Sequence, residues 1–283
     1  LVNYRKAVMN DDIAWSIIAV PSAKWAAKVF PHLPEQEQVD ALWNAIFKTV
    51  RIGDGDAVEA WHEHVANLEK RAAQLNAKRY KALHYKAPGT DLTIELPEKH
   101  LWLTGGSKTP QGTTFIANMP TEEVYTMPAK YGVDGTVSNT KPLVYKGNII
   151  DQFTLTFKNG KIVKAHAQVG NDLLQQLITT DEGSSYLGEV ALVPHQSPIS
   201  ASNILYYNTL FDENASNHLA IGEAYPTCYE GGRELEQGQL ESLGINTSVT
   251  HEDFMIGSGE MDIDGELADG TMEPIFRKGN WAF

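Results

Sequence analysis

The sequence predicts a remnant of an α/β domain, one strand with helices, over residues 1–85. An α+β metal-binding domain with mixed, mostly antiparallel strands follows over residues 86–283. Helical patterns dominate the first third of the chain, the composition changes near the run YKAPG at 85–89, and strand-like runs dominate from there on. With 283 residues, the chain is long enough to bury a substantial core in one large or two smaller domains.

One strand and three helices are expected in the first region. Residues 15–20 (WSIIAV) form a continuous apolar run, which is typical of a strand buried on both faces of a parallel sheet. Helical patterns follow at 23–30, 35–50 and 57–78. A parallel strand needs neighbours and this region offers no others, so we expect the partner strands to lie outside this chain.

The second region contains clear strand and hairpin signals. They predict strands at 90–96, 186–194 and 249–256, hairpins around Asn159-Gly160 and Asp269-Gly270, a turn at Asp134-Gly135 and a helix at 171–180.

Residues 208–225 (NTLFDENASNHLAIGEAY) concentrate polar and titratable side chains around a short helical pattern. If residues 216–225 are helical, His218, Gly222 and Tyr225 share one face, and Glu213 lies in the preceding loop. Glycine costs roughly 1 kcal/mol in a helix interior relative to alanine, so Gly222 indicates that something large approaches the backbone there. A surface helix with a core histidine fits this segment equally well.

Composition and charge narrow the class of protein. The formal net charge of −13 argues against a nucleic-acid partner, and no apolar run approaches the length of a membrane span. Cys228 is the one cysteine, so no intrachain disulfide can form and a reducing, cytoplasmic compartment is the simplest interpretation. Asp11 and Asp12 interrupt the apolar stretch that a secretory signal would need.

Several acidic residues and histidines have the chemistry of metal ligands. Glu189 interrupts an apolar strand, where a lone carboxylate must be paired, protonated or bound to a cation. His251 and Asp253 stand at i and i+2 of a strand and share a face, which suits a metal or an ordinary hydrogen-bonded pair. Glu122 and Glu123 follow a strand-like run, where adjacent acids usually form a solvated turn.

A cation site would explain these residues together. The candidate ligands comprise four carboxylates and two imidazoles: Glu123, Glu189, Glu213, His218, His251 and Asp253. Four negative charges close together repel by several kcal/mol at an effective dielectric of ~20, and two divalent cations would balance them. Zinc, cobalt, manganese and magnesium all fit oxygen-rich sites with a few imidazoles. The spacing in the sequence does not by itself show that these residues converge.

Four long motifs carry a resemblance to a known family. The runs NMPTEEVYTMP (118–128), LGEVALVP (187–194), NTLFDENASNHLAIGEAY and HEDFMIGSGEMDIDG (251–265) resemble the bacterial two-metal aminopeptidases of the aminopeptidase T and aminopeptidase S type. The resemblance implies that the six residues above ligate the metals and that Tyr225 lies beside them. It also implies a homodimer, a further N-terminal stretch, and an α/β N-terminal domain before the metal-bearing one.

The resemblance implies hydrolysis of the N-terminal peptide bond of a peptide substrate by a water that two metals activate. Glu189 is expected to bridge the metals, because a mid-strand carboxylate can present both oxygens. Tyr225 is expected to donate a hydrogen bond to the oxyanion, and Glu122 or an exchangeable ligand carboxylate to act as general base. Two alternatives remain open: a di-metal hydrolase of a non-peptide amide or ester, and a non-catalytic peptide-binding protein.

Overall fold

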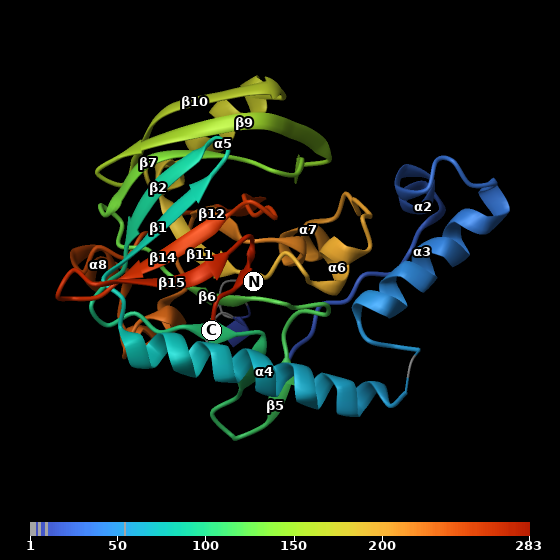
Figure 1. The fold of residues 1–283 in the computed structure, drawn as a ribbon, viewed down its shortest axis with the longest axis horizontal. Helices are drawn as coiled ribbons and strands as arrows, with labels where there is room; N and C mark the ends of the chain where they lie inside the picture. Colours follow the sequence, from blue (N-terminus) through green and yellow to red (C-terminus); the bar gives the residue numbers. More distant parts are fainter. Residues whose placement is uncertain (1–3, 5–6, 9–10, 54) are drawn as a thin grey trace.

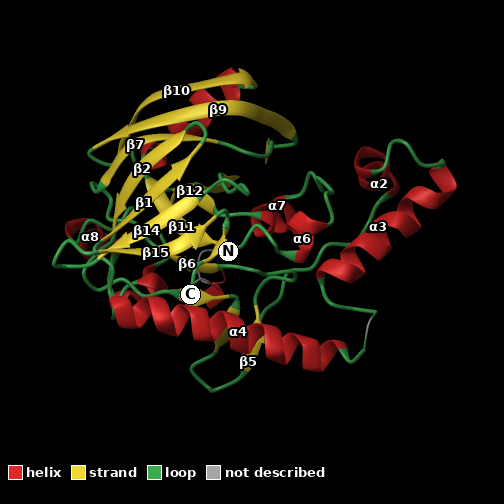
Figure 2. Ribbon diagram, in the orientation of Figure 1, coloured by secondary structure: helices red, strands yellow, loops and turns green. Residues whose placement is uncertain are grey.

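Two antiparallel sheets form the centre of the molecule (Figures 1 and 2). The computed structural model describes residues 4, 7–8, 11–53 and 55–283. The larger sheet has the strand order β10-β9-β7-β2-β1-β14-β15-β16, with β8 paired to β9, and the smaller one has the order β13-β12-β11-β6-β3. Strands β4 and β5 form a separate hairpin. Within the described residues every pairing of these strands is antiparallel.

The strands have the following bounds. In the larger sheet they are β1 (Ala82–Ala87), β2 (Thr90–Glu95), β7 (Val133–Ser138), β8 (Leu143–Tyr145), β9 (Asn148–Lys158), β10 (Lys161–Val169), β14 (Asp262–Glu266), β15 (Met272–Arg277) and β16 (Asn280–Trp281). In the smaller sheet they are β3 (Leu103–Thr104), β6 (Val124–Thr126), β11 (Leu187–Leu192), β12 (His218–Gly222) and β13 (His251–Met255). The hairpin consists of β4 (Gly106–Lys108) and β5 (Thr114–Ile116).

The main hydrophobic core takes apolar side chains from both sheets. In the smaller sheet, Val190 of β11, Leu219 and Ile221 of β12 and Phe254 of β13 all belong to this core. Successive side chains of a strand point to opposite faces, so the residues between these positions lie on the other face of the sheet. That second face is also largely buried, and it carries the polar residues described below.

Helices cover one edge of the smaller sheet and build a second core. The helices are α2 (Ala23–Val29), α3 (Glu35–Thr49), α4 (Ala57–Lys78), α5 (Asn171–Ile178), α6 (Pro198–Ala201), α7 (Thr209–Asp212) and α8 (Gln237–Ser242). The long helix α4 packs on β3 and β6 and runs along the bottom of Figure 1. Helices α2 and α3 extend to the right in that view, and Ala26 of α2 and Leu42 and Ile46 of α3 belong to one core cluster with Phe211 of α7.

The predicted strand at 15–20 is wrong. Among the described residues its only ladder contact is a parallel bridge between Ile17 and Asn118, and Ile17, Ile18 and Val20 are 51%, 64% and 63% exposed. The run is extended beside residues 117–119, but it is not inserted into a sheet. The partner strands expected outside this chain stay a prediction. The helices predicted at 23–30, 35–50 and 57–78 are confirmed.

The predicted helix at 216–225 is also wrong, because residues 218–222 form β12 between β11 and β13. Leu219 and Ala220 favour helices in isolation, but pairing on both edges overrides that preference. The predicted turn at Asp134-Gly135 lies inside β7. Gly135 is needed there because its φ is +122° and a Cβ would come within 2.2 Å of the Asp91 carbonyl oxygen on β2.

Most other expectations for the second region are confirmed. The runs at 90–96, 186–194 and 249–256 contain β2, β11 and β13, the two predicted hairpins are β9–β10 and β14–β15, and the run at 171–180 contains α5. The division into residues 1–85 and 86–283 stays a prediction, and β1 crosses that boundary. In the described part of the chain, no helix combines the length and apolar character needed to cross a membrane.

Candidate metal centre

The six predicted ligands come from adjacent strands of the smaller sheet and the loops beside them. Ala220 on β12 lies opposite Glu189 on β11 and opposite Asp253 on β13. Gly222, two residues along the same face, lies opposite His251. The small residues of β12 thus leave a gap between acidic and imidazole groups on either side. The alternation that buries Leu219 and Ile221 in the core is what places His218, Ala220 and Gly222 on this face.

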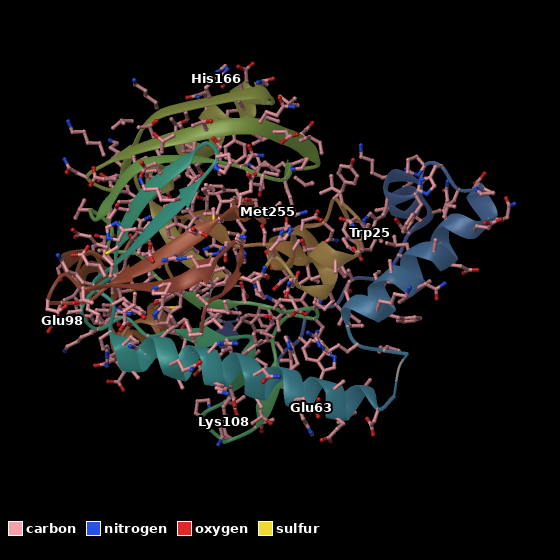
Figure 3. The ribbon with its side chains drawn as sticks, in the orientation of Figure 1. Trp25, Glu63, Glu98, Lys108, His166 and Met255 are labelled. Atoms are coloured by element: carbon pink, nitrogen blue, oxygen red, sulfur yellow. The ribbon has the colours of Figure 1, made fainter. Side chains whose placement is uncertain are left out.

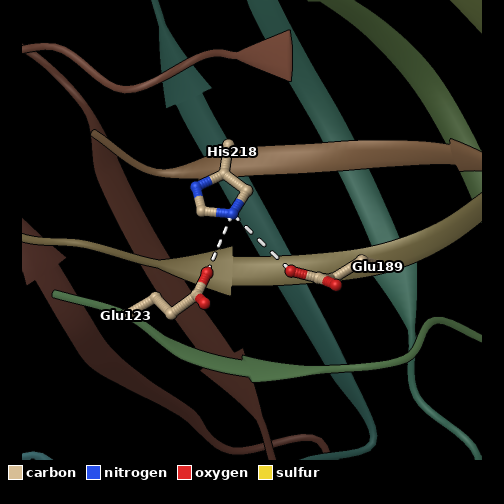
Figure 4. Close-up of side chains that lie close together, drawn as sticks. All are labelled: Glu123, Glu189 and His218. Carbon is tan, nitrogen blue, oxygen red and sulfur yellow. Dashed lines mark ion pairs between the residues drawn. The ribbon is translucent and has the colours of Figure 1, made fainter. Parts of the chain in front are cut away.

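The first group of ligand atoms joins three strands (Figure 4). His218 Nε2 lies 3.0 Å from Glu123 Oε2 and 3.6 Å from Glu189 Oε1, and all three residues are buried. Glu123 directly precedes β6, while Glu189 and His218 belong to β11 and β12. The three side chains point toward one another in Figure 4, as the ligands of one ion would.

The second group shares Glu189 with the first. His251 Nε2 lies 3.4 Å from Glu189 Oε2 and 3.6 Å from Asp253 Oδ1. Candidate ligand atoms of these three residues lie within 4.8 Å of one another. The two oxygens of Glu189 therefore face two different histidines. This is the geometry expected of a carboxylate that bridges two neighbouring cation positions.

Both histidines have a fixed tautomer. His218 Nδ1 lies 3.2 Å from the Ser216 carbonyl oxygen, and His251 Nδ1 lies 2.7 Å from that of Glu223. A carbonyl oxygen only accepts, so each Nδ1 carries a proton and donates it. In the neutral rings each Nε2 then presents a lone pair to carboxylate oxygens, which are also acceptors. A proton or a metal ion must lie between them, and this donor set fits a divalent cation.

Burial strongly perturbs the charges of the cluster. Burial raises the pKa of Glu123, which the hydrogen bond to His218 partly offsets. The pKa of Glu213 lies well above its ordinary value because the carboxyl is buried and close to Asp253 and Glu123. Asp253 Oδ1 is buried and has no hydrogen-bond partner among the described residues. Burial thus disfavours the negative charges of Glu123 and Glu213, and a cation held by the cluster would favour their ionised forms.

A cavity of about 300 Å³ opens onto the cluster. The lining includes all six predicted ligands and Tyr225, whose ring centroid lies 4.7 Å from that of His251. A protonated His251 would lower the pKa of Tyr225, but burial and the nearby carboxylates outweigh this effect and raise it, so the phenol keeps its proton and can donate. Tyr225 follows β12 and is not part of a helix.

Glu122 lies outside this lining. Its carboxylate pairs with Arg51, whose Nη2 lies 2.7 Å from Oε1, and His64 Nε2 lies 3.7 Å from its Oε2. Neighbouring residues of an extended chain point in opposite directions, so Glu123 faces the cavity while Glu122 faces away from it. The two acids do not form the solvated turn that is usual for adjacent acidic residues, because Glu122 and Glu123 are 4% and 7% exposed.

Sequence reasoning missed several residues around the site. Tyr125 lines the cavity beside Tyr225, with ring centroids 6.2 Å apart, and its position two residues after Glu123 could have revealed it. Arg51 and His64 gave no local signal, because their partners are distant in the sequence. Gly222 is explained by the chain itself: its φ is +107° and a Cβ would come within 2.2 Å of the Thr250 carbonyl oxygen.

Comparison with known proteins gives a consistent result. The chain matches the thermophilic metalloprotease family (M29) over residues 1–281. It is 57% identical to aminopeptidase AmpS from Bacillus subtilis (strain 168), covering 100% of this chain and 69% of that protein. It is 54% identical to aminopeptidase 2 from Geobacillus stearothermophilus, covering 100% of this chain and 68% of that protein.

Two solved structures are also similar. Wild-type AmpT from Thermus thermophilus matches with a TM-score of 0.90 and 41% identity, covering 98% of this chain and 67% of that one. The match to a 2,5-dihydroxypyridine dioxygenase from Pseudomonas putida KT2440 covers 99% of this chain and 74% of the dioxygenase chain. Its TM-score of 0.54 and 15% identity show likeness of fold alone.

The family match and the relatives show a metal-dependent hydrolase, and the carboxylate–imidazole cluster has the chemistry to hold the metal. The chain belongs to the M29 family of thermophilic metalloproteases, and it spans about two thirds of the length of the relatives above. It is a metal-dependent aminopeptidase that acts on peptides, as the motifs implied.

Proposed function

We propose that the cluster holds two divalent cations and that Glu189 bridges them. The main support for this proposal is that Glu189 belongs to both groups of candidate ligands, with Oε1 toward His218 and Oε2 toward His251. Glu123 and His218 complete one cation position, and His251 and Asp253 complete the other. Glu213 lines the cavity beside both and is the sixth ligand. Zinc, cobalt, manganese and magnesium are the candidate ions.

The protein groups around the cations have distinct tasks. When bound, the two cations supply a Lewis-acid centre that lowers the pKa of a water and polarises the scissile carbonyl. The backbone carbonyls of Ser216 and Glu223 hold the two imidazoles with Nε2 directed at the cation positions. The Tyr225 hydroxyl donates a hydrogen bond to the oxyanion of the tetrahedral intermediate. Glu122 does not fit the role of general base, so an exchangeable carboxylate of the cluster takes the proton.

A free amino terminus distinguishes the substrate from an N-acylated peptide. With two divalent cations bound, the four carboxylates of the cluster would be balanced in charge, and one cation position would accept the lone pair of a free α-amine. An N-acylated peptide lacks that lone pair and adds bulk at the same end. This difference accounts for cleavage of the first peptide bond only.

A panel of three substrates tests this proposal. Leucine 4-nitroanilide, its N-acetyl derivative and leucine ethyl ester would be assayed with added Co²⁺ and, as a control, after chelation. We expect fast cleavage of the free-amine amide, at least a hundredfold slower cleavage of the acetylated one, and loss of activity on chelation. Equal cleavage of the free and acetylated amides would contradict recognition of the amino terminus.

We also propose a cytoplasmic homodimer. The resemblance to dimeric aminopeptidases supports the dimer, and the single buried Cys228 suits a reducing compartment. Light scattering coupled to size-exclusion chromatography tests the dimer, and cell fractionation tests the compartment. A monomer at micromolar concentration would contradict the first proposal.

A further inference from the structure

A buried polar network lies directly behind the Glu123 ligand. Arg51 Nη2 lies 3.0 Å from Glu122 Oε2 and also 3.0 Å from His64 Nδ1. His64 Nε2 lies 2.7 Å from the Thr121 carbonyl oxygen. Because a carbonyl only accepts, Nε2 carries the proton, and Nδ1 accepts from the guanidinium. The His64 ring is therefore neutral, and it is hydrogen-bonded to Arg51 through Nδ1 and to the Thr121 carbonyl through Nε2.

This network holds the backbone that immediately precedes Glu123. The Thr121 carbonyl accepts from His64, and the Glu122 side chain is paired with Arg51. The Glu122 backbone N–H donates to Asn214 Oδ1 at 2.7 Å. Asn214 is fully buried, and its Nδ2 donates to the Leu210 carbonyl at 3.1 Å. Two of these contacts hold the peptide unit between Thr121 and Glu122, and the third holds the Glu122 side chain, so the chain is fixed up to the residue that immediately precedes Glu123.

Arg51 itself is held in an uncommon conformation. Its φ of +60° lies in the left-handed region, which residues other than glycine seldom adopt. Its guanidinium carbon lies 5.3 Å from the centroid of the Trp61 ring, and Trp61 Nε1 donates to the Val50 carbonyl at 2.8 Å. Such costly backbone persists where surrounding contacts determine it, often for a functional reason. Here the conformation directs the side chain at Glu122.

We propose that Arg51 is a positioning residue for the metal site at Glu123, acting through Glu122 together with His64. The inference rests on the proposed metal centre. Groups that orient a ligand typically contribute about 10–100-fold to metal affinity. Arg51 follows α3 and His64 lies on α4, whereas the six ligands lie at residues 123–253. The metal centre therefore depends on the helical first third of the chain for the orientation of one ligand.

The test compares metal binding by three variants of the chain. Arg51→Met removes the cation and leaves Glu122 buried without its partner. The double variant Arg51→Met/Glu122→Gln removes both charges, so it tests affinity even where the single variant fails to fold. Arg79→Met is the matched control, because Arg79 forms an ion pair with Glu230 in which both side chains are more than 40% exposed. Each metal-free protein would be titrated with Co²⁺ by calorimetry and visible absorption, and its thermal unfolding recorded.

We expect the double variant to be folded and to lose about 10–100-fold in affinity for one Co²⁺ ion, with an altered cobalt spectrum. Affinity for the second ion should change little, because His251 and Asp253 do not contact the network. Arg79→Met should bind as the unaltered chain does. A folded double variant with unaltered affinity and spectrum would overturn the inference. An unaltered chain that binds no Co²⁺ would instead overturn the proposed metal centre, and this inference with it.

Discussion

Replacing Glu189 with glutamine should separate the two cation positions of the proposed centre. The substitution keeps the size of the side chain but exchanges one oxygen for an amide nitrogen, which donates and cannot ligate a cation. Glu189 Oε1 and Oε2 lie 3.6 Å and 3.4 Å from the Nε2 atoms of His218 and His251. Either orientation of the amide leaves one cation position without its oxygen.

The expected loss of affinity follows from the charges. Unit charges about 4 Å apart interact by about 4 kcal/mol at an effective dielectric of 20, so a divalent cation loses about 8 kcal/mol of attraction. Repulsion between Glu189 and the neighbouring carboxylates is the same with and without the cation, so its loss does not change the affinity. The full loss of about 8 kcal/mol sets an upper limit of roughly a millionfold weaker affinity for at least one ion, and we expect a loss of at least about a thousandfold. Turnover should fall by a similar factor or more.

Calorimetric titration of the metal-free proteins with Co²⁺ would measure this loss, alongside kcat for leucine 4-nitroanilide. Glu63→Gln is the matched control, since Glu63 is exposed on α4 and labelled in Figure 3. The metal-free Glu189→Gln protein should still fold, because the substitution keeps the volume of the side chain. Unaltered stoichiometry, affinity and turnover would refute the bridging role.

Three further predictions follow from the same geometry. Tyr225→Phe should lower kcat by roughly 10²–10³-fold with little change in KM, and an unchanged kcat in steady-state assays would show that Tyr225 only packs. Gly222→Ala should lower the free energy of unfolding by at least about 1–3 kcal/mol in urea titrations, because its φ is +107° and the Thr250 carbonyl leaves no space for a Cβ. Burial and the Arg51 charge lower the pKa of His64 from 6.5 to about 4, so its contribution to stability is complete above pH 6.5 and is lost as pH falls toward 4. When the pH falls from 6.5 to 4, the free energy of unfolding of the unaltered chain should therefore decrease by about 3 kcal/mol more than that of the His64→Gln variant. Parallel curves of unfolding free energy against pH would contradict the lowered pKa of His64.

The sequence was a good guide wherever structure follows from local pattern. The long helix at 57–78 and the hairpin around Asn159-Gly160 needed only periodicity and turn chemistry. The sequence was a poor guide at β12, because HLAIG carries helix-forming residues and its strand identity comes from β11 and β13 on either side. The apolar run at 15–20 has the composition of a buried strand, yet it lies mostly exposed against residues 117–119.

The candidate ligands were identified through chemistry and motif resemblance, and their convergence required the fold. Spacing could place His251 and Asp253 on one face of a strand, but it could not bring them to Glu189. Glu122 shows the limit of the approach, because its partner Arg51 is 71 residues away and gives no local pattern. The predicted boundary at residue 85 likewise takes no account of contacts between residues that are distant in the sequence. A chain that began at Lys86 would cut β1 and lose both Arg51 and His64.

The location of bound metal tests the central claim most directly. Crystals soaked with Co²⁺ and measured by anomalous diffraction at the cobalt edge should show two peaks. One should lie among Glu123, Glu189 and His218, and the other among Glu189, His251 and Asp253, each with ligand atoms at roughly 2.0–2.3 Å. Glu189 should contact both ions. A single peak that Glu189 does not ligate, or peaks outside this cavity, would contradict the bridged two-metal centre.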